Sequence, residues 1–173
     1  EDTRLRAGAD GWKAAGCTLC VDSEWGKERA GIRTEMMDIS AQKIQKKLND
    51  GETVCLESLS AEDTFALGAL LGEGGVPGQV YTLTGDLGVG KTVFTQGFAK
   101  GIGIEGPVNS PTFTILQVYE EGRLPFFHFD VYRIADVEEM DEIGYEDCFY
   151  GEGICLIEWA ELIEEILPEH SVQ

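Results

Sequence analysis

The fold is decided by Gln79-Val80-Tyr81-Thr82-Leu83-Thr84-Gly85-Asp86-Leu87-Gly88-Val89-Gly90-Lys91-Thr92. Its first six residues are rich in β-branched and aromatic side chains, which favour a strand. The last eight match G-x-x-x-x-G-K-T, in which glycines let backbone N–H groups turn inward around phosphate oxygens. A helix beginning at Lys91 then presents its positive N-terminus to the same anion. The stretch therefore predicts a strand, a phosphate-binding loop (P-loop) and a helix, in that order.

Two side chains at the end of this loop predict magnesium-nucleotide chemistry. Lys91 is expected to reach the β- and γ-phosphates as a point charge, and the Thr92 hydroxyl is expected to bind the Mg²⁺ that bridges them. A glycine-rich turn with a chance lysine is the alternative, but the strand before the loop and the apolar-faced helix after it favour nucleotide binding. The candidate phosphate-binding residues are Leu87, Gly88, Val89, Gly90, Lys91 and Thr92.

A P-loop enzyme also needs an acidic group at the end of a neighbouring strand, to hold the metal directly or through water. Glu158 follows the four apolar residues 154–157 and is the predicted metal carboxylate, although it could simply begin a helix over 159–167. Asp130 ends the strand expected over 124–130 and is the other candidate, which could position water or join the magnesium shell. Parallel strands meet at their carboxyl ends, so we expect Thr84, Asp130 and Glu158 near one edge of the sheet.

Four nearby features allow two interpretations each. The segment 110–114, Ser-Pro-Thr-Phe-Thr, could approach the γ-phosphate as a switch loop does, or could be a turn before a strand. His128, Tyr132 and Arg133 could serve the site, or could be a core histidine, a packed aromatic and a surface ion-pair former.

Strands alternating with helices predict an α/β fold, a single P-loop NTPase domain with a largely parallel sheet flanked by helices. Strands are expected over 53–59, 79–84, 112–119, 124–130 and 154–158, and helices over 91–100 and 136–142. Another helix is expected to start after Ser60 as N-cap, because acidic residues follow it. Phe65, Leu67, Leu70 and Leu71 are its expected buried face.

The chain of 173 residues divides into three expected parts. Residues 1–35 have no sustained apolar rhythm and are expected to be a disordered or extraneous leader. Residues 36–52 have a helical pattern and form an N-terminal extension. Residues 53–173 form the P-loop domain, in a length that suits one core.

The net charge of −19 is unevenly distributed. Residues 1–55 hold nine of the 13 Lys and Arg residues and ten of the 32 Asp and Glu residues, which leaves 13 − 9 = 4 cations and 32 − 10 = 22 anions for residues 56–173. A surface that binds nucleic acid needs clustered cations to displace counterions. Any link to RNA is therefore expected to run through a protein partner, although the acidity could equally serve solubility alone.

The sequence predicts a cytoplasmic protein with reduced thiols. No run approaches the length of a membrane span, and the first residues lack the pattern of a signal peptide. The five cysteines are an odd number, which argues against a disulfide framework. Cys17 and Cys20 have the C-x-x-C spacing of a zinc or redox pair, but no second pair follows, so we interpret the spacing as coincidental.

The motifs in this order resemble the TsaE (YjeE) ATPases of bacterial tRNA threonylcarbamoyladenosine (t6A) biosynthesis. Together they are far more specific than a P-loop alone, and the similarity covers about residues 56–168. The matching segments are residues 60–64 (SAEDT), 85–92 (GDLGVGKT), 110–114 (SPTFT), 128–133 (HFDVYR) and 155–159 (CLIEW).

The resemblance implies a small P-loop ATPase of weak intrinsic activity that docks on a TsaB–TsaD pair and contacts tRNA only indirectly. It implies that ATP hydrolysis resets that complex and that the family does not itself transfer the threonylcarbamoyl group. By the same resemblance, Lys91 and Asp130 serve the catalytic centre, Thr92 and Glu158 hold Mg²⁺, and Thr64 lies near the adenine. Family members continue into further strands, so the domain is expected to be truncated at its C-terminus, with an uncovered sheet edge.

Two other functions fit a P-loop. A small-molecule kinase begins with the same strand, loop and helix, but usually needs lid arginines, and residues 56–173 contain only Arg123 and Arg133. A nucleotide-gated binding module with incidental hydrolysis is the second alternative. The guanine-reading N-K-x-D pattern is absent from the sequence, which argues against a GTPase.

Overall fold

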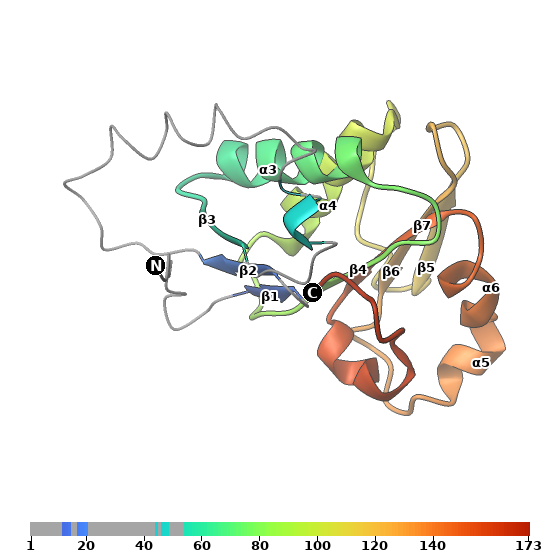
Figure 1. The fold of residues 1–173 in the computed structure, drawn as a ribbon. Helices are drawn as coiled ribbons and strands as arrows, with labels where there is room; N and C mark the ends of the chain where they lie inside the picture. The colour runs from blue at the N-terminus through green and yellow to red at the C-terminus, as the bar shows by residue number, and fades with distance from the viewer. Residues whose placement is uncertain (1–11, 15–16, 21–43, 45, 49–53) are drawn as a thin grey trace.

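The P-loop domain is built on a four-stranded sheet (Figure 1). The computed structural model describes residues 12–14, 17–20, 44, 46–48 and 54–173. The sheet order is β4-β7-β6-β5. Its strands are β4 (Val80–Leu83), β5 (Leu116–Tyr119), β6 (Phe126–Asp130) and β7 (Ile154–Glu158). Strand β7 runs parallel to both β4 and β6, and β5 is antiparallel to β6. This confirms the predicted α/β fold with a largely parallel sheet.

Strands β4 and β7 consist mainly of apolar residues because both faces of the sheet are covered. All five residues of β7 and all four of β4 are buried. Alternation sends Ile154 and Leu156 to the core shared with α4 (Lys91–Ile102), and Cys155 and Ile157 to a second core beneath α6 (Tyr145–Phe149). Glu158, two residues beyond Leu156, therefore belongs to the face that α4 covers.

Helix α4 packs closely on α3 (Ala61–Gly74) through glycines. A Cβ atom on Gly97 would stand 2.0 Å from the Phe65 carbonyl oxygen, and one on Gly68 would stand 2.1 Å from the Phe94 carbonyl oxygen. The Ser60 cap is confirmed, since its Oγ accepts a hydrogen bond from the Asp63 N–H at 3.1 Å. The predicted buried face was wrong at Phe65, which is 38% exposed, because glycines rather than a large side chain face α4.

Three predicted elements differ from the structure in type or length. Residues 112–115 form a turn rather than the start of a strand, since the Pro111 carbonyl accepts hydrogen bonds from the N–H groups of Thr114 and Ile115. The helix expected over 159–167 is a 3₁₀ helix, η1 (Ala160–Ile166), with a kink at Ile163. The acidic helix expected over 136–142 is shorter, as α5 (Glu139–Ile143).

A second sheet involves the expected leader. Strand β1 (Trp12–Ala14) pairs antiparallel with β2 (Cys17–Cys20), and β2 pairs parallel with β3 (Val54–Glu57). These two leader strands were not predicted, because three or four residues are too few for a periodic signal. Of the helical extension expected over 36–52, residues 44 and 46–48 are described as helical, with Ile44 and Leu48 buried and Lys46 and Lys47 exposed; the rest lies outside the described residues.

The outer side of β4 carries one bridge to the C-terminal segment. The Val172 N–H donates to the Val80 carbonyl and the Thr82 N–H donates to the Val172 carbonyl, each at 2.8 Å. The edge expected to be uncovered is therefore paired at Tyr81, which lies opposite Val172.

Candidate nucleotide-binding site

The P-loop takes the conformation that its glycines allow. It connects β4 to α4, and Gly85, Gly88 and Gly90 have φ values of 125°, 84° and 103°. Residues with a Cβ atom rarely adopt such angles. A Cβ atom on Gly88 would have no heavy atom within 4 Å, so at this position the backbone angle, not space, requires glycine.

The N-terminus of α4 has no side-chain cap. Gly90 is the N-cap residue and supplies no side-chain acceptor to the first-turn N–H groups. Four amides at a helix start have no partner within the helix and need acceptors from elsewhere. Together with the helix dipole, these groups favour an anion at this end of α4.

Lys91 lies across the loop with its side chain 5% exposed. Its Nζ donates to the carbonyl oxygens of Gly85 at 2.6 Å and Asp86 at 2.8 Å, and stands 3.6 Å from the centroid of the Trp159 ring. Burial lowers the Lys91 pKa from its usual value, and the carboxylates of Glu158, Glu161, Asp130 and Asp86 oppose that shift. The loop thus holds a desolvated ammonium group, which interacts strongly with an anion.

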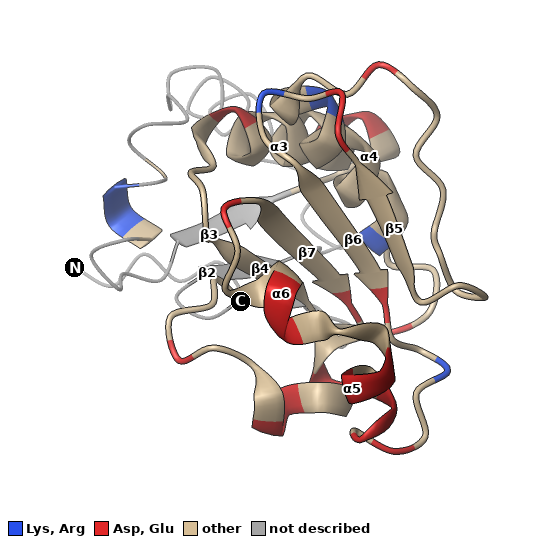
Figure 2. Ribbon diagram, turned by 90° about the vertical axis from the view of Figure 1, so that its right-hand side faces the viewer, with Lys and Arg blue, Asp and Glu red and all other residues tan. Residues whose placement is uncertain are grey.

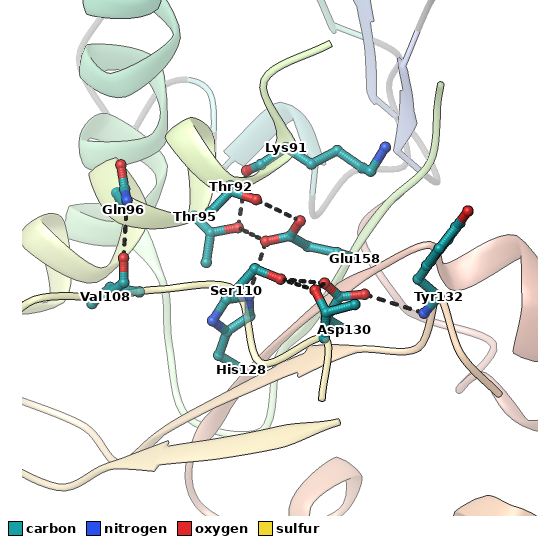
Figure 3. Close-up of polar contacts among 11 residues, drawn as sticks. Lys91, Thr92, Thr95, Gln96, Val108, Ser110, His128, Asp130, Tyr132 and Glu158 are labelled. Atoms are coloured by element: carbon teal, nitrogen blue, oxygen red, sulfur yellow. Dashed lines mark hydrogen bonds and ion pairs between the residues drawn. The ribbon is translucent and has the colours of Figure 1, made fainter. Parts of the chain in front are cut away.

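Three side chains from two elements, α4 and β6, contact the Glu158 carboxylate (Figure 3). Its Oε2 accepts a hydrogen bond from the Thr92 hydroxyl at 3.0 Å, and its Oε1 lies 3.0 Å from the Thr95 hydroxyl and 2.9 Å from His128 Nε2. The carboxylate is only 2% exposed. Glu158 is therefore held beside the first turn of α4, as predicted for a carboxylate at the end of a neighbouring strand.

Asp130 ties a loop to the sheet. Its Oδ2 accepts hydrogen bonds from Ser110 and from Thr112, the latter at 2.6 Å, and its Oδ1 accepts from the Tyr132 N–H at 3.1 Å. Ile115, at the end of the same loop, has a φ of 64° and accepts a backbone hydrogen bond from the Asp130 N–H at 2.9 Å. The structure thus brings the hydroxyls of the segment 110–114 to Asp130, and this segment is more than a turn before a strand.

These groups surround one pocket of about 460 Å³, within the range for small-ligand sites. The sheet register explains why they meet, because Leu83 and Asp130 both lie opposite Glu158 on the flanking strands. The pocket is lined by Leu87, Gly88, Gly90, Lys91, Thr92, Val93, Ser110, Thr112, Asp130, Tyr132, Glu158 and Trp159.

Two predicted binding residues do not line this pocket. Val89 packs against the core. The Thr64 hydroxyl lies 2.6 Å from Ser58 Oγ and donates to the Ser60 carbonyl at 3.1 Å, while its Cγ2 lies 3.7 Å from the position of a Cβ on Gly90. Thr64 thus supports the back of the P-loop, and its placement near an adenine remains a prediction.

Sequence reasoning missed two residues of the site. Thr95 donates to the Lys91 carbonyl as well as facing Glu158, and its position three residues after Thr92, on the same helix face, was the available signal. Trp159 packs on Tyr132 with ring centroids 4.8 Å apart and has a φ of 66°. Nothing in the sequence indicates this left-handed conformation at a tryptophan.

The two arginines of the domain have other contacts. Arg123 donates to the carbonyl oxygens of Gly72 and Gly75 at 2.6 Å each, at the C-terminus of α3. Arg133 stacks on Phe113, with Cζ 4.4 Å from the ring centroid. Neither lines the pocket.

Comparison with known proteins decides the family. The family model described as "Threonylcarbamoyl adenosine biosynthesis protein TsaE" matches residues 58–173. The chain belongs to the TsaE family. This confirms the resemblance seen in the sequence motifs, and the matched range contains every pocket-lining residue of this TsaE-family chain.

Individual proteins similar to this chain support the family assignment. A Bacillus subtilis (strain 168) protein named tRNA threonylcarbamoyladenosine biosynthesis protein TsaE is 51% identical over 116 residues, covering 67% of this chain and 72% of that protein. A Treponema pallidum protein of the same name is 47% identical over 115 residues, covering 66% and 84%. The crystal structure of Bacillus subtilis YdiB matches with a TM-score of 0.56 at 46% identity, covering 65% of this chain and 68% of that one.

Within the described ranges, no helix has the length and apolar character needed to cross a bilayer. The same part of the chain holds no group of three or more His, Cys, Asp or Glu side chains arranged for a metal ion.

Proposed function

We propose that this chain is a weak, magnesium-dependent ATPase that supports t6A modification of tRNA by acting on a TsaB–TsaD complex. The observation that carries the enzymatic part is the 3.0 Å hydrogen bond between the Thr92 hydroxyl and Glu158, beside Lys91 and the P-loop. The family description supports the place in t6A biosynthesis.

ATP fits the loop because of the donors gathered there. The uncapped first turn of α4 and the positive-φ glycines supply backbone N–H groups, and Lys91 adds a buried positive charge. Both kinds of group bind phosphate oxygens in P-loops. Lys91 can exchange two neutral carbonyl acceptors for anionic oxygens, which make the stronger hydrogen bonds.

Magnesium fits the oxygen donors of Thr92 and Glu158. The single hydrogen of the Thr92 hydroxyl points to Glu158, which leaves its oxygen lone pairs for a hard cation. Thr92 and Glu158 would hold the bound Mg²⁺, which would offset the negative charge that develops during phosphoryl transfer. Glu158 is suited to hold the metal directly or through a water molecule.

Asp130 is proposed to place the hydroxyls of Ser110 and Thr112 beside the γ-phosphate and to serve the attacking water. Its two oxygens already accept three hydrogen bonds, from Ser110, Thr112 and the Tyr132 N–H. A carboxylate so engaged is a poor proton acceptor until one of these bonds is exchanged for water. This occupancy supports a slow intrinsic rate.

The family resemblance and the acidic character of the domain support the proposed protein partner. Acidic residues are frequent in α5 and the segments around it, and Lys and Arg residues are sparse in the described domain (Figure 2). Such a surface repels a phosphate backbone, so contact with tRNA is proposed to be indirect. TsaB–TsaD itself comes from the family resemblance.

Kinase activity receives no support from the pocket. The stacking of Arg133 on Phe113 and the carbonyl contacts of Arg123 leave no arginine among the lining residues. Measurements of ATP binding and of phosphate release together distinguish a nucleotide-gated binding module from an ATPase.

ATP with Mg²⁺ is expected to raise the thermal unfolding temperature, because a ligand bound only to the native state stabilises it. At 100 times its Kd, ATP contributes about 2.7 kcal/mol, or roughly 5 to 10 °C for a domain of this size. Scanning fluorimetry with ATP, ATP plus EDTA, and GTP tests binding, and phosphate release tests turnover. No shift with ATP and Mg²⁺ would refute the proposal; a shift without phosphate release would leave a nucleotide-gated binding module.

Asp130→Asn is expected to lower kcat for ATP hydrolysis by about tenfold to a hundredfold, while the Kd for ATP changes little. The amide keeps the size of the side chain but loses one hydrogen-bond acceptor and the negative charge. Single-turnover hydrolysis and equilibrium ATP binding measure the two effects. Glu121→Gln, an exposed acid in the β5–β6 turn, is the matched control. An unchanged kcat in Asp130→Asn would remove Asp130 from the catalytic centre.

The partner claim is tested by reconstituting tRNA modification from purified TsaB, TsaD and tRNA, with and without this chain. The ATPase rate is expected to rise when TsaB and TsaD are added together. An unchanged rate in a mixture competent for modification would remove the partner from the proposal and leave the ATPase intact.

A further inference from the structure

His128 is buried within hydrogen-bond reach of the proposed metal carboxylate. It lies in the middle of β6, its exposed fraction is 0%, and it lies opposite Leu156 of β7. Two-residue alternation puts His128 and Asp130 on the face of the sheet that α4 covers, together with Glu158. The Phe126 ring stacks beside the imidazole, with centroids 6.0 Å apart and planes at 11°. The ring is therefore fixed by packing, and its Nε2 stands 2.9 Å from Glu158 Oε1.

His128 and Thr95 differ in how fully they can donate a hydrogen bond to Glu158. The Thr95 hydroxyl has one hydrogen, and two acceptors lie 3.0 Å from its oxygen, namely Glu158 Oε1 and the Lys91 carbonyl. That hydrogen is shared, as is usual for a threonine bonding back along its helix. Among the described residues, His128 is thus the one donor to Oε1 that has no competing acceptor at the same nitrogen.

The other ring nitrogen fixes the tautomer. Nδ1 of His128 is buried and has no hydrogen-bond partner in the described part of the chain. A hydrogen there would have no acceptor, so the hydrogen belongs on Nε2, where it is donated to the carboxylate. A histidine that served packing alone would normally have both nitrogens paired, because buried polar atoms without partners are costly.

We propose that His128 is a positioning residue for magnesium: its Nε2–H holds Glu158 Oε1 and so directs Oε2 to the Thr92 hydroxyl. This inference rests on the proposed function, because Thr92 and Glu158 are the proposed metal-binding pair. Residues that orient metal ligands through such hydrogen bonds typically set metal affinity within a range of about 10- to 100-fold.

The test compares His128→Leu with His128→Gln in the full chain. Leucine fills the site without a donor, whereas the glutamine amide can extend an N–H toward the position of Nε2. ATP affinity is measured by calorimetry at a series of Mg²⁺ concentrations and in EDTA. Mg²⁺ is expected to raise ATP affinity in both proteins, and His128→Leu is expected to need about 10- to 100-fold more Mg²⁺ than the wild type to reach half of that increase. His128→Gln is expected to recover most of that loss, and affinities in EDTA are expected to match the wild type.

Thr95→Val is the matched comparison, because it removes the second neighbour of the same carboxylate oxygen. It is expected to raise the Mg²⁺ requirement less than His128→Leu does. An equal or larger effect of Thr95→Val, or an unchanged requirement in His128→Leu, would overturn the role of His128. Loss of ATP affinity in EDTA for both His128 variants would also overturn it, since the defect would then be structural. If the ATP affinity of the wild type did not depend on Mg²⁺ concentration, the proposed metal site itself would be refuted.

Discussion

Lys91→Ala is expected to lower kcat/KM for ATP hydrolysis by about a hundredfold or more, the scale seen when one charge-stabilising group is removed from an active site. In the structure its ammonium is held at the P-loop by two carbonyls at 2.6 and 2.8 Å and lies close to the Trp159 ring. Alanine leaves the phosphate position without this desolvated charge. Steady-state phosphate release and ATP binding by calorimetry measure the loss.

The matched control is Lys100→Ala, which removes an exposed lysine from the same helix. It keeps the net charge equal to that of Lys91→Ala and is expected to hydrolyse ATP at the wild-type rate. Equal activities in the two variants would mean that the P-loop of this chain does not act through Lys91. Circular dichroism and the unfolding midpoint of both variants separate a folding defect from a chemical one.

Gly97→Ala is expected to destabilise the native state by about 2 to 3 kcal/mol, the upper part of the range of about 1 to 3 kcal/mol for overpacking a core. The added Cβ would stand 2.0 Å from the Phe65 carbonyl oxygen, and both atoms belong to helical backbones that must separate. The higher helix propensity of alanine offsets only about 1 kcal/mol of the cost. The unfolding midpoint is expected to fall by roughly 4 to 12 °C.

Gly106→Ala is the glycine control for this prediction. Its Cβ atom would meet the Glu121 carboxylate at 3.3 Å, the far end of an exposed side chain that can move away. Its stability is expected to stay within about 0.5 kcal/mol of the wild type. If Gly97→Ala proved as stable as Gly106→Ala in urea unfolding, the close α3–α4 contact would be wrong.

The sequence predicted the parts of the site that depend on alternation along the chain. The apolar run of β7 located Glu158 at a strand end, and the expected parallel strands placed Asp130 near the same edge of the sheet. These features follow from backbone periodicity, which is a local property of the sequence. The strand order, in which β4 and β6 both pair with β7 and bring the P-loop beside the two carboxylates, was not predicted.

The missed features depend on contacts between distant segments. The glycines of α3 and α4 look like helix-weakening residues until the two helices are brought together. The left-handed backbone at Trp159 is imposed by tertiary packing against an intrinsic preference. The hydrogen bonds that Thr95 and His128 make to Glu158 can be assigned only from the three-dimensional structure. Neither residue type by itself indicates which carboxylate oxygen it contacts.

Helix α4 links folding to ligand affinity. Its first turn faces the pocket through Lys91 and Thr92, and its middle, at Gly97, lies against α3. Any state in which the two helices separate also loses the geometry of the phosphate-binding end. The apparent Kd for a ligand bound there equals the intrinsic Kd divided by the fraction of molecules in which the helix pair is closed, so affinity falls as that fraction falls. For the proposed nucleotide, the glycine contact would therefore set affinity without touching the ligand, and bound nucleotide would stabilise the closed helix pair by the same free energy.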